Sequence, residues 1–230
     1  MVEESASRPD IDRYLETTGL DVYIQDALIL VLENRPEDPI RFLVEYFQTC
    51  EKPGTPLSRA YRYLTMTPRT RPAFMYNLVS AFTILNTAKN GSQPCGLHGK
   101  EFAKILYLLS SEFPVEVITP LFKIMKKSDS DLIEFSEFRE AVYLTLQFEE
   151  LFAATEWLFK GCDPDSSGTI SKEKLNTIMA IMQSDPTTSN LLDPGKTSMQ
   201  KDRLSYNDFL LHMLRICSLP GTSNDSDSNF

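Results

Sequence analysis

The sequence predicts an all-α fold, with an N-terminal helical hairpin followed by a larger helical domain. Three observations support this prediction. Apolar residues recur at helical intervals near the N-terminus, proline and aspartate mark helix starts and breaks, and an aliphatic residue recurs at nearly constant spacing further along the chain. The chain has 230 residues, of which 42% are hydrophobic, enough for one or two cores.

A first helix is predicted over residues 14–33. Its apolar residues recur at steps of three and four, as one buried helical face requires; they are Leu15, Leu20, Ile24, Ala27, Leu28, Val31 and Leu32. Residues 34–36, which include a proline, end this helix. A second, short helix should begin at Pro39, because proline fits the first helical turn, and Asp38 should cap it. The predicted hairpin spans residues 13–50.

Within the hairpin, the segment DALILVLENRPEDPIRFLVEYF resembles the dimerisation-docking motif of protein kinase A regulatory subunits and Dpy-30 proteins, the RIIa/Dpy-30 type. In that family two hairpins pair, and their joint surface binds an amphipathic helix of a partner. The resemblance implies a partner-binding face made of Ile24, Leu28, Val31, Leu32, Ile40, Leu43 and Phe47. A lone hairpin is too small to bury itself, so a second copy, another subunit or later helices of its own chain must cover it. The sequence leaves these alternatives open.

A polar linker and a short helix are expected over residues 51–72, and one further helical domain over residues 73–218. In this domain an aliphatic residue precedes a bulky apolar one by five positions in four segments. The aliphatic residues lie 36, 37 and 34 positions apart, at Leu97, Ile133, Ile170 and Leu204. This pattern resembles degenerate EF-hands, whose 12-residue loop has an aliphatic residue at position eight and a carboxylate at position twelve. Residues 1–12 and 219–230 are polar and are expected to be disordered.

One of the four loops comes close to the pattern that calcium requires. It begins at Asp163, and the candidate metal ligands are Asp163, Asp165, Ser167 and Thr169. Position twelve is Lys174, which places a positive charge where two carboxylate oxygens belong. We therefore expect a structural, metal-free role and no cofactor, with a weak calcium site at this loop as the alternative.

The composition argues against several functional classes. With a formal net charge of −9 and no Lys/Arg cluster longer than a pair, the chain should bind neither nucleic acid nor an anionic membrane. It has two histidines and no phosphate-binding, zinc-protease or nucleophile-elbow motif, so we predict no catalytic residue and no enzyme activity. Four isolated cysteines and the lack of a secretory or membrane-spanning segment indicate a reduced, intracellular protein.

Several segments together resemble one family, that of subunit 1 of the tubulin polyglutamylase complex. The resemblance runs from about residue 14 to residue 159, and it rests on order and spacing of the segments RPEDPIRFLVEYF, SRAYRYL, AFMYNLVSA, GLHGK, PVEVITPL and the Phe138–Arg139 pair. It implies a non-catalytic scaffold or targeting subunit that supports a tubulin tyrosine ligase-like enzyme, which adds glutamates to tubulin tails. The implied partners are that enzyme, the other subunits and, indirectly, microtubules.

The implied location is the cytoskeleton, at the centrosome, the ciliary basal body or the axoneme. An acidic chain repels glutamate-rich tails, which favours a scaffold over a substrate holder. The alternative is a ciliary or flagellar adaptor with RIIa and EF-hand-like parts that responds weakly to calcium through the Asp163 loop. An unrecognised enzyme is a further alternative, although two histidines and no phosphate loop make an active site hard to build.

Overall fold

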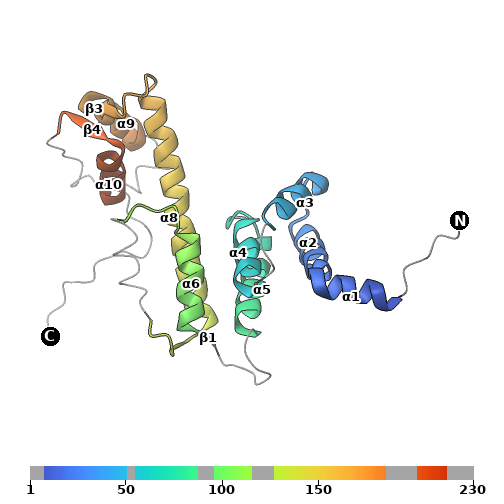
Figure 1. Ribbon diagram of the computed structural model, residues 1–230. Helices are drawn as coiled ribbons and strands as arrows, with labels where there is room; N and C mark the ends of the chain where they lie inside the picture. Colours follow the sequence, from blue (N-terminus) through green and yellow to red (C-terminus); the bar gives the residue numbers. More distant parts are fainter. Residues whose placement is uncertain (1–7, 51–54, 88–95, 116–126, 185–200, 217–230) are drawn as a thin grey trace, which may run out of the picture. The chain divides into compact units, whose positions relative to one another are not determined.

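A computed structural model describes residues 8–50, 55–87, 96–115, 127–184 and 201–216 of the chain (Figure 1). These residues are mostly helical, which confirms the predicted all-α fold. Among them, no helix combines the length and the apolar character needed to cross a bilayer. The termini expected to be disordered lie outside the described residues, except that residues 8–12 form part of a helix.

The helices of the described residues are α1 (Arg8–Thr18), α2 (Leu20–Asn34), α3 (Pro39–Gln48), α4 (Pro56–Thr65), α5 (Ala73–Thr87), α6 (Gly99–Leu109), α8 (Phe135–Cys162), α9 (Lys172–Ser184) and α10 (Tyr206–Ile216). The strands are β1 (Leu97–His98), β2 (Leu132–Ile133), β3 (Thr169–Ser171) and β4 (Arg203–Ser205). The chain divides into two compact units, Met1–Gln147 and Phe148–Phe230, here called unit 1 and unit 2. Their boundary falls within α8, inside the range 73–218 that the sequence analysis assigns to one domain.

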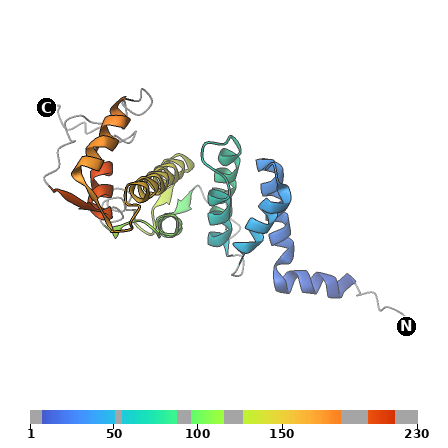
Figure 2. The same ribbon diagram turned by 90° about the horizontal axis from the view of Figure 1, so that it is seen from above.

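The N-terminal helix differs from the single helix predicted from residue 14. Helix α1 begins at Arg8. Proline is tolerated in a first helical turn, and the negative charge of Asp10 in that turn interacts favourably with the positive end of the helix dipole. Gly19 then adopts a left-handed conformation with φ of 63°, which separates α1 from α2 (Figure 2). The apolar periodicity continues across this break, so periodicity alone could not reveal it.

Helices α2 and α3 form a hairpin at the positions where the sequence places it. The Asp38 carboxylate accepts a hydrogen bond of 2.9 Å from the Arg41 N–H, and Pro39 occupies the first turn of α3. One face of the hairpin joins the core of unit 1, to which α4, α5, α6 and the first part of α8 also contribute. The hairpin contributes the buried side chains of Ala27, Leu30, Phe42 and Tyr46 to this core. Later helices of the same chain therefore cover this face of the hairpin.

Two buried polar clusters connect α2 to later parts of unit 1. Asp26 is 2% exposed and accepts hydrogen bonds from Arg59 Nε at 2.7 Å and from the Tyr63 hydroxyl at 3.1 Å. Asn34 accepts a hydrogen bond from Thr67, which in turn accepts one of 2.8 Å from the Asn77 amide. Because such groups are costly to bury unpaired, each cluster holds α2 in one position on α4 and α5.

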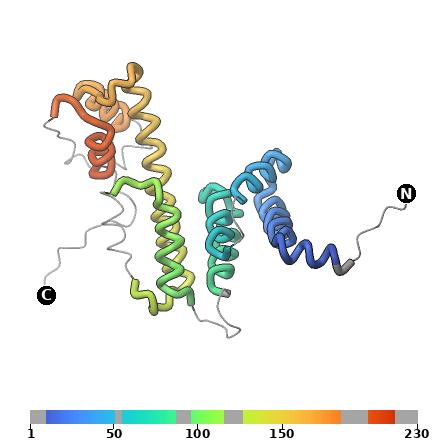
Figure 3. The backbone as a smooth tube through the Cα atoms, viewed as in Figure 1, coloured from blue at the N-terminus to red at the C-terminus, as the bar shows by residue number. Residues whose placement is uncertain are grey.

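Two short antiparallel ladders pair the repeated aliphatic residues. Figure 3 traces the backbone of the chain that contains them. In unit 1, Leu97 lies opposite Ile133, and in unit 2, Ile170 lies opposite Leu204. All four side chains are buried. The spacing that the sequence analysis detected therefore corresponds to two pairs of loops, each joined by one ladder.

The core of unit 2 is smaller and centres on α8, α9 and α10. Phe159 packs against the rings of Tyr206 and Phe209, at centroid distances of 5.5 and 5.7 Å. His212 is buried beside this core, and burial lowers the pKa of its imidazole, with a smaller contribution from Arg215.

Candidate functional site

The predicted partner-binding residues lie on α2 and α3, and the structure divides them into two groups. The exposed group has side chains between 43% and 70% accessible and consists of Ile24, Leu28, Leu32, Ile40 and Phe47. Val31 and Leu43 are instead half-buried and pack against the core of unit 1. The seven residues therefore do not share one solvent-exposed surface, because periodicity identifies an apolar stripe but not which edge of it the rest of the chain covers.

On α3 the structure adds one residue that sequence reasoning missed. Val44 is 51% exposed and lies one turn after Ile40 and almost one turn before Phe47. The spacing of Ile40, Val44 and Phe47 along α3 could have revealed it. We call the following set the exposed hairpin face: Ile24, Leu28, Leu32, Ile40, Val44 and Phe47. Exposed apolar sets of this kind commonly mark interaction sites in soluble proteins.

Hydrogen bonds from within the Asp163 loop to the Asp163 carboxylate hold this loop closed. One carboxylate oxygen of Asp163 accepts hydrogen bonds from the N–H and the hydroxyl of Ser167, at 2.9 and 2.8 Å. The other oxygen accepts the Gly168 N–H at 2.8 Å. These bonds, the Ser167 hydroxyl first among them, lower the pKa of Asp163. Gly168 has φ of 75°, which suits the turn at this position.

Cationic side chains lie beside the start and beside the seventh position of this loop. The Lys174 ammonium donates a hydrogen bond of 2.7 Å to the Cys162 carbonyl, immediately before Asp163. The Arg203 guanidinium donates to the Thr169 hydroxyl at 2.7 and 3.0 Å. Asp165, the remaining candidate ligand, is exposed. Across the part of the chain that the structure describes, no group of three or more His, Cys, Asp or Glu side chains is arranged to hold a metal ion.

In two other loops, a lysine of the loop itself pairs with the side chain at the twelfth position. Lys127 forms an ion pair with Glu137 in the second loop, and Lys201 pairs with Asp208 at 2.6 Å in the fourth. Parts of the first, second and fourth loops lie outside the described residues. In the second, third and fourth loops, a lysine ammonium thus supplies positive charge at or beside the position where an EF-hand carboxylate would bind calcium.

Comparison with known proteins assigns the family. A family model described as "Tubulin polyglutamylase complex subunit 1-like, C-terminal" matches residues 51–218. The chain belongs to this family. The match begins after α3, so it covers the EF-hand-like loops but not the hairpin.

Individual relatives extend the similarity. Human "Tubulin polyglutamylase complex subunit 1" is 24% identical over 222 residues, covering 88% of this chain and 76% of the relative. The zebrafish "Centriolar satellite-associated tubulin polyglutamylase complex regulator 1" is 26% identical over 156 residues, which is 65% of this chain and 46% of the relative. Its human counterpart is 28% identical over 173 residues, 71% of this chain and 50% of the relative. The chain thus spans about half the length of these regulators, and no solved structure matches it.

Proposed function

We propose that this protein is a non-catalytic scaffold subunit of a tubulin polyglutamylase complex, and that its exposed hairpin face packs against a helix of another subunit. The observation that supports this is the apolar exposure of both hairpin helices. Their opposite faces are already used in the core of unit 1, so the hairpin is anchored and still presents apolar side chains outward.

The number of exposed apolar side chains is sufficient for a specific contact. Burying a fully exposed apolar side chain contributes about 1.5 to 3 kcal/mol, and these side chains, which are 43% to 70% exposed, would each contribute about half of that. Association costs an estimated 4 to 15 kcal/mol in lost freedom, so several of these residues must be buried together. An amphipathic helix that contacts α2 and α3 at once would do this, and it would leave the buried side of the hairpin unchanged.

The relatives' names support a division of roles between this chain and a catalytic partner. One relative is named as a subunit of a tubulin polyglutamylase complex, and the other is named as a regulator of that complex. A tubulin tyrosine ligase-like partner would supply the glutamate transfer, while this chain positions that partner in the complex. The proposed location is the cytoskeleton, at the centrosome, the ciliary basal body or the axoneme, with microtubules contacted through the other subunits.

A second candidate is a calcium-responsive adaptor, which Asp163 and the turn at Gly168 favour. Lys174 opposes it, because its ammonium lies at the start of the loop. Calorimetry that shows no heat at millimolar calcium would exclude this candidate.

Affinity purification from ciliated cells tests the proposal. The tagged protein is compared with a Leu28→Asp/Ile40→Asp variant, because both side chains are exposed and neither packs in the core. Ile181→Asp on α9 is the control, since Ile181 is also exposed, at 64%. We expect the wild-type and control proteins to recover a ligase-like enzyme and microtubule glutamylation activity, and the double variant to recover neither.

Two results would contradict the proposal. Full recovery of the complex by the double variant would remove the hairpin face from the assembly. If the purified protein sediments as a dimer that the double variant dissociates, the occupant of the face would be a second copy instead of another subunit.

A further inference from the structure

Trp157, the single tryptophan of the chain, lies on the surface of unit 2. Its side chain is 78% exposed, more than any other large apolar side chain among the residues that the structure describes. The same stretch of α8 buries Phe152, Thr155 and Phe159. At 3.6 residues per turn these three residues lie on the opposite side of the helix from Trp157. The indole ring therefore points away from the core of unit 2.

The nearest residues of α8 leave this ring uncovered. Ala153 and Ala154 lie one turn before Trp157, Gly161 lies one turn after it, and all three are exposed. Two alanines and a glycine are too small to cover an indole ring. Tryptophan has a large apolar surface, and it is enriched among the residues that contribute most to protein–protein binding. The ring is therefore accessible to a partner.

The charges of unit 2 indicate which partner would contact this ring. Residues 148–230 contain twelve acidic and seven basic side chains, a formal net charge of −5, which is more than half of the −9 of the whole chain. The exposed Glu150 lies on the same side of α8 as Trp157, about 10 Å earlier along the helix axis. Lys160 lies one turn after Trp157, and its ammonium forms an ion pair of 2.5 Å with Glu156. A cationic partner therefore meets a favourable field.

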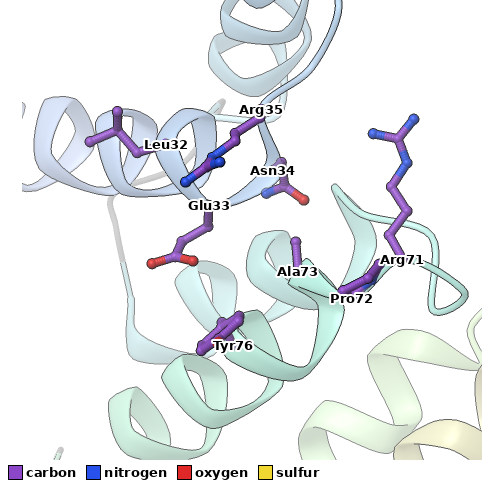
Figure 4. Close-up of a pocket in the computed structure, with 8 residues that line it drawn as sticks. All are labelled: Leu32, Glu33, Asn34, Arg35, Arg71, Pro72, Ala73 and Tyr76. Atoms are coloured by element: carbon purple, nitrogen blue, oxygen red, sulfur yellow. The ribbon is translucent and has the colours of Figure 1, made fainter.

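A hollow in unit 1 lacks this agreement between charge and surface. It has a volume of about 500 Å³ and lies between the end of α2 and the start of α5 (Figure 4). Glu33, Arg35 and Arg71 all line it, so charges of both signs face the same space. Figure 4 shows the two guanidinium groups pointing apart. This hollow therefore favours no single ligand charge, whereas the ring of Trp157 and the acidity of unit 2 both favour a cation.

We propose that Trp157 anchors an arginine-rich segment of a partner protein, with one guanidinium stacked on the indole ring and a second beside Glu150. The guanidinium group is planar and weakly hydrated, so it stacks on aromatic rings better than the compact lysine ammonium does. In an extended segment, arginines about three residues apart span the 10 Å between the two contacts. The site lies in unit 2, so the inference does not depend on the exposed hairpin face.

The test compares octa-arginine with octa-lysine, which carry the same charge, in binding to the full chain. Fluorescence anisotropy of fluorescein-labelled peptides at low salt measures both affinities. We expect octa-arginine to bind about two- to fivefold more tightly, the advantage of a cation stacked on an exposed ring. Because the chain has one tryptophan, its emission reports on this site alone, and unlabelled octa-arginine should change it.

Four variants separate stacking from overall charge. Trp157→Leu should bind the two peptides equally, and Trp157→Phe should keep part of the preference for arginine. Glu150→Gln should weaken both peptides about twofold and leave their ratio unchanged. Glu16→Gln removes the same charge from an exposed position in unit 1 and should have a smaller effect. Each variant should keep the melting temperature of the wild type, because all three side chains are exposed.

Several results would overturn the inference. Equal binding of the two peptides by the wild type, or a preference for arginine that survives in Trp157→Leu, would exclude stacking on the ring. Tryptophan emission that octa-arginine leaves unchanged would do the same. If Glu16→Gln weakens binding as much as Glu150→Gln, the second contact is wrong. If acrylamide does not quench the emission of the protein alone, the ring is already covered by the chain itself or by a second copy.

Discussion

Units 1 and 2 both join two loops by a short antiparallel ladder, and they support that ladder by different means. In unit 1 the Gly99 N–H donates to the Asp131 carbonyl at 2.9 Å, and in unit 2 the Lys172 N–H donates to the Asp202 carbonyl at 3.0 Å. The backbone pattern is therefore the same at the two places. Each unit also has a lysine–carboxylate ion pair in its loops, Lys127–Glu137 in unit 1 and Lys201–Asp208 in unit 2. Unit 1 adds close backbone packing at Gly99, whereas unit 2 adds the hydrogen bonds that Asp163 accepts within its own loop.

The difference teaches which part of the chain is specialised for which task. Unit 1 extends its core with the hairpin, links that hairpin by buried polar clusters, and keeps an apolar face outside. Unit 2 has a loop that is already satisfied by Asp163, Ser167 and Lys174. A shared loop geometry is thus combined with an anchored hairpin that exposes apolar side chains in one unit, and with a loop closed by its own hydrogen bonds in the other.

The largest expected effect is steric and is specific to unit 1. A Cβ atom on Gly99 would lie 2.1 Å from the Ser128 carbonyl oxygen, so Gly99→Ala must displace backbone. We expect a loss of about 2 to 3 kcal/mol in unfolding free energy, with faster hydrogen exchange in β1 and α6. Gly161→Ala in α8 is the control, because nothing lies within 4 Å of its added Cβ. Equal stability of the two variants would refute the steric account.

The next effect concerns the buried link between the hairpin and α4. Asp26→Ala leaves the Arg59 guanidinium and the Tyr63 hydroxyl without their acceptor. We expect a loss of about 2 kcal/mol in urea unfolding, since the arginine can still reach solvent in part. Glu45→Ala removes one partner of an exposed pair and should cost less than about 0.5 kcal/mol. A comparable loss in the two variants would show that the buried cluster is not what holds the hairpin.

A third prediction converts the loop of unit 2 into a metal site. Lys174→Glu removes the ammonium from the Cys162 carbonyl and provides the carboxylate that calcium needs at position twelve. We expect calorimetric heat at millimolar calcium for this variant and none for the wild type. Lys172→Glu makes the same change of charge at the wrong position and should stay silent. Calcium binding by the wild type would contradict the closure of this loop by its own hydrogen bonds.

The smallest effect is a pH dependence confined to unit 2. Burial lowers the pKa of His212 below its usual value of about 6.5, so in the window between the two values the unfolded chain takes up a proton that the folded chain does not. The free energy of unfolding should therefore fall as the pH drops from 7 through this window. His212→Phe, which cannot titrate, should show a weaker dependence in urea unfolding at pH 7.0 and 5.5. Identical slopes for both proteins would contradict the assignment.

Local signals in the sequence predicted much of the fold. Asp38 and Pro39 mark the start of α3 because capping and proline geometry depend on neighbouring residues alone. The spacing marked Leu97, Ile133 and their two counterparts as equivalent positions of a repeat, and the structure adds that they lie opposite one another in the ladders. Gly19 interrupts the first helix without disturbing its apolar periodicity, so this break was missed.

Long-range contacts could not be predicted in the same way. Whether Leu43 faces solvent or the core depends on how the hairpin packs against the core of unit 1, which residues next to Leu43 in the sequence do not specify. The buried hydrogen bonds of Thr67 with Asn34 and Asn77 likewise join separate segments, and no pattern near any of the three residues indicates them. The partner-binding and calcium-binding assignments themselves stay predictions.

Site-specific photo-crosslinking in the intact complex tests the central claim most directly. A photoreactive amino acid replaces Leu28 of the exposed hairpin face in one protein and Ile181 of α9 in another, and cross-linked peptides are identified by mass spectrometry after purification from ciliated cells. The account predicts cross-links from position 28 to a helix of another polyglutamylase subunit, and far fewer from position 181. Cross-links that arise from position 181 alone, or none from position 28 in an active complex, would contradict it.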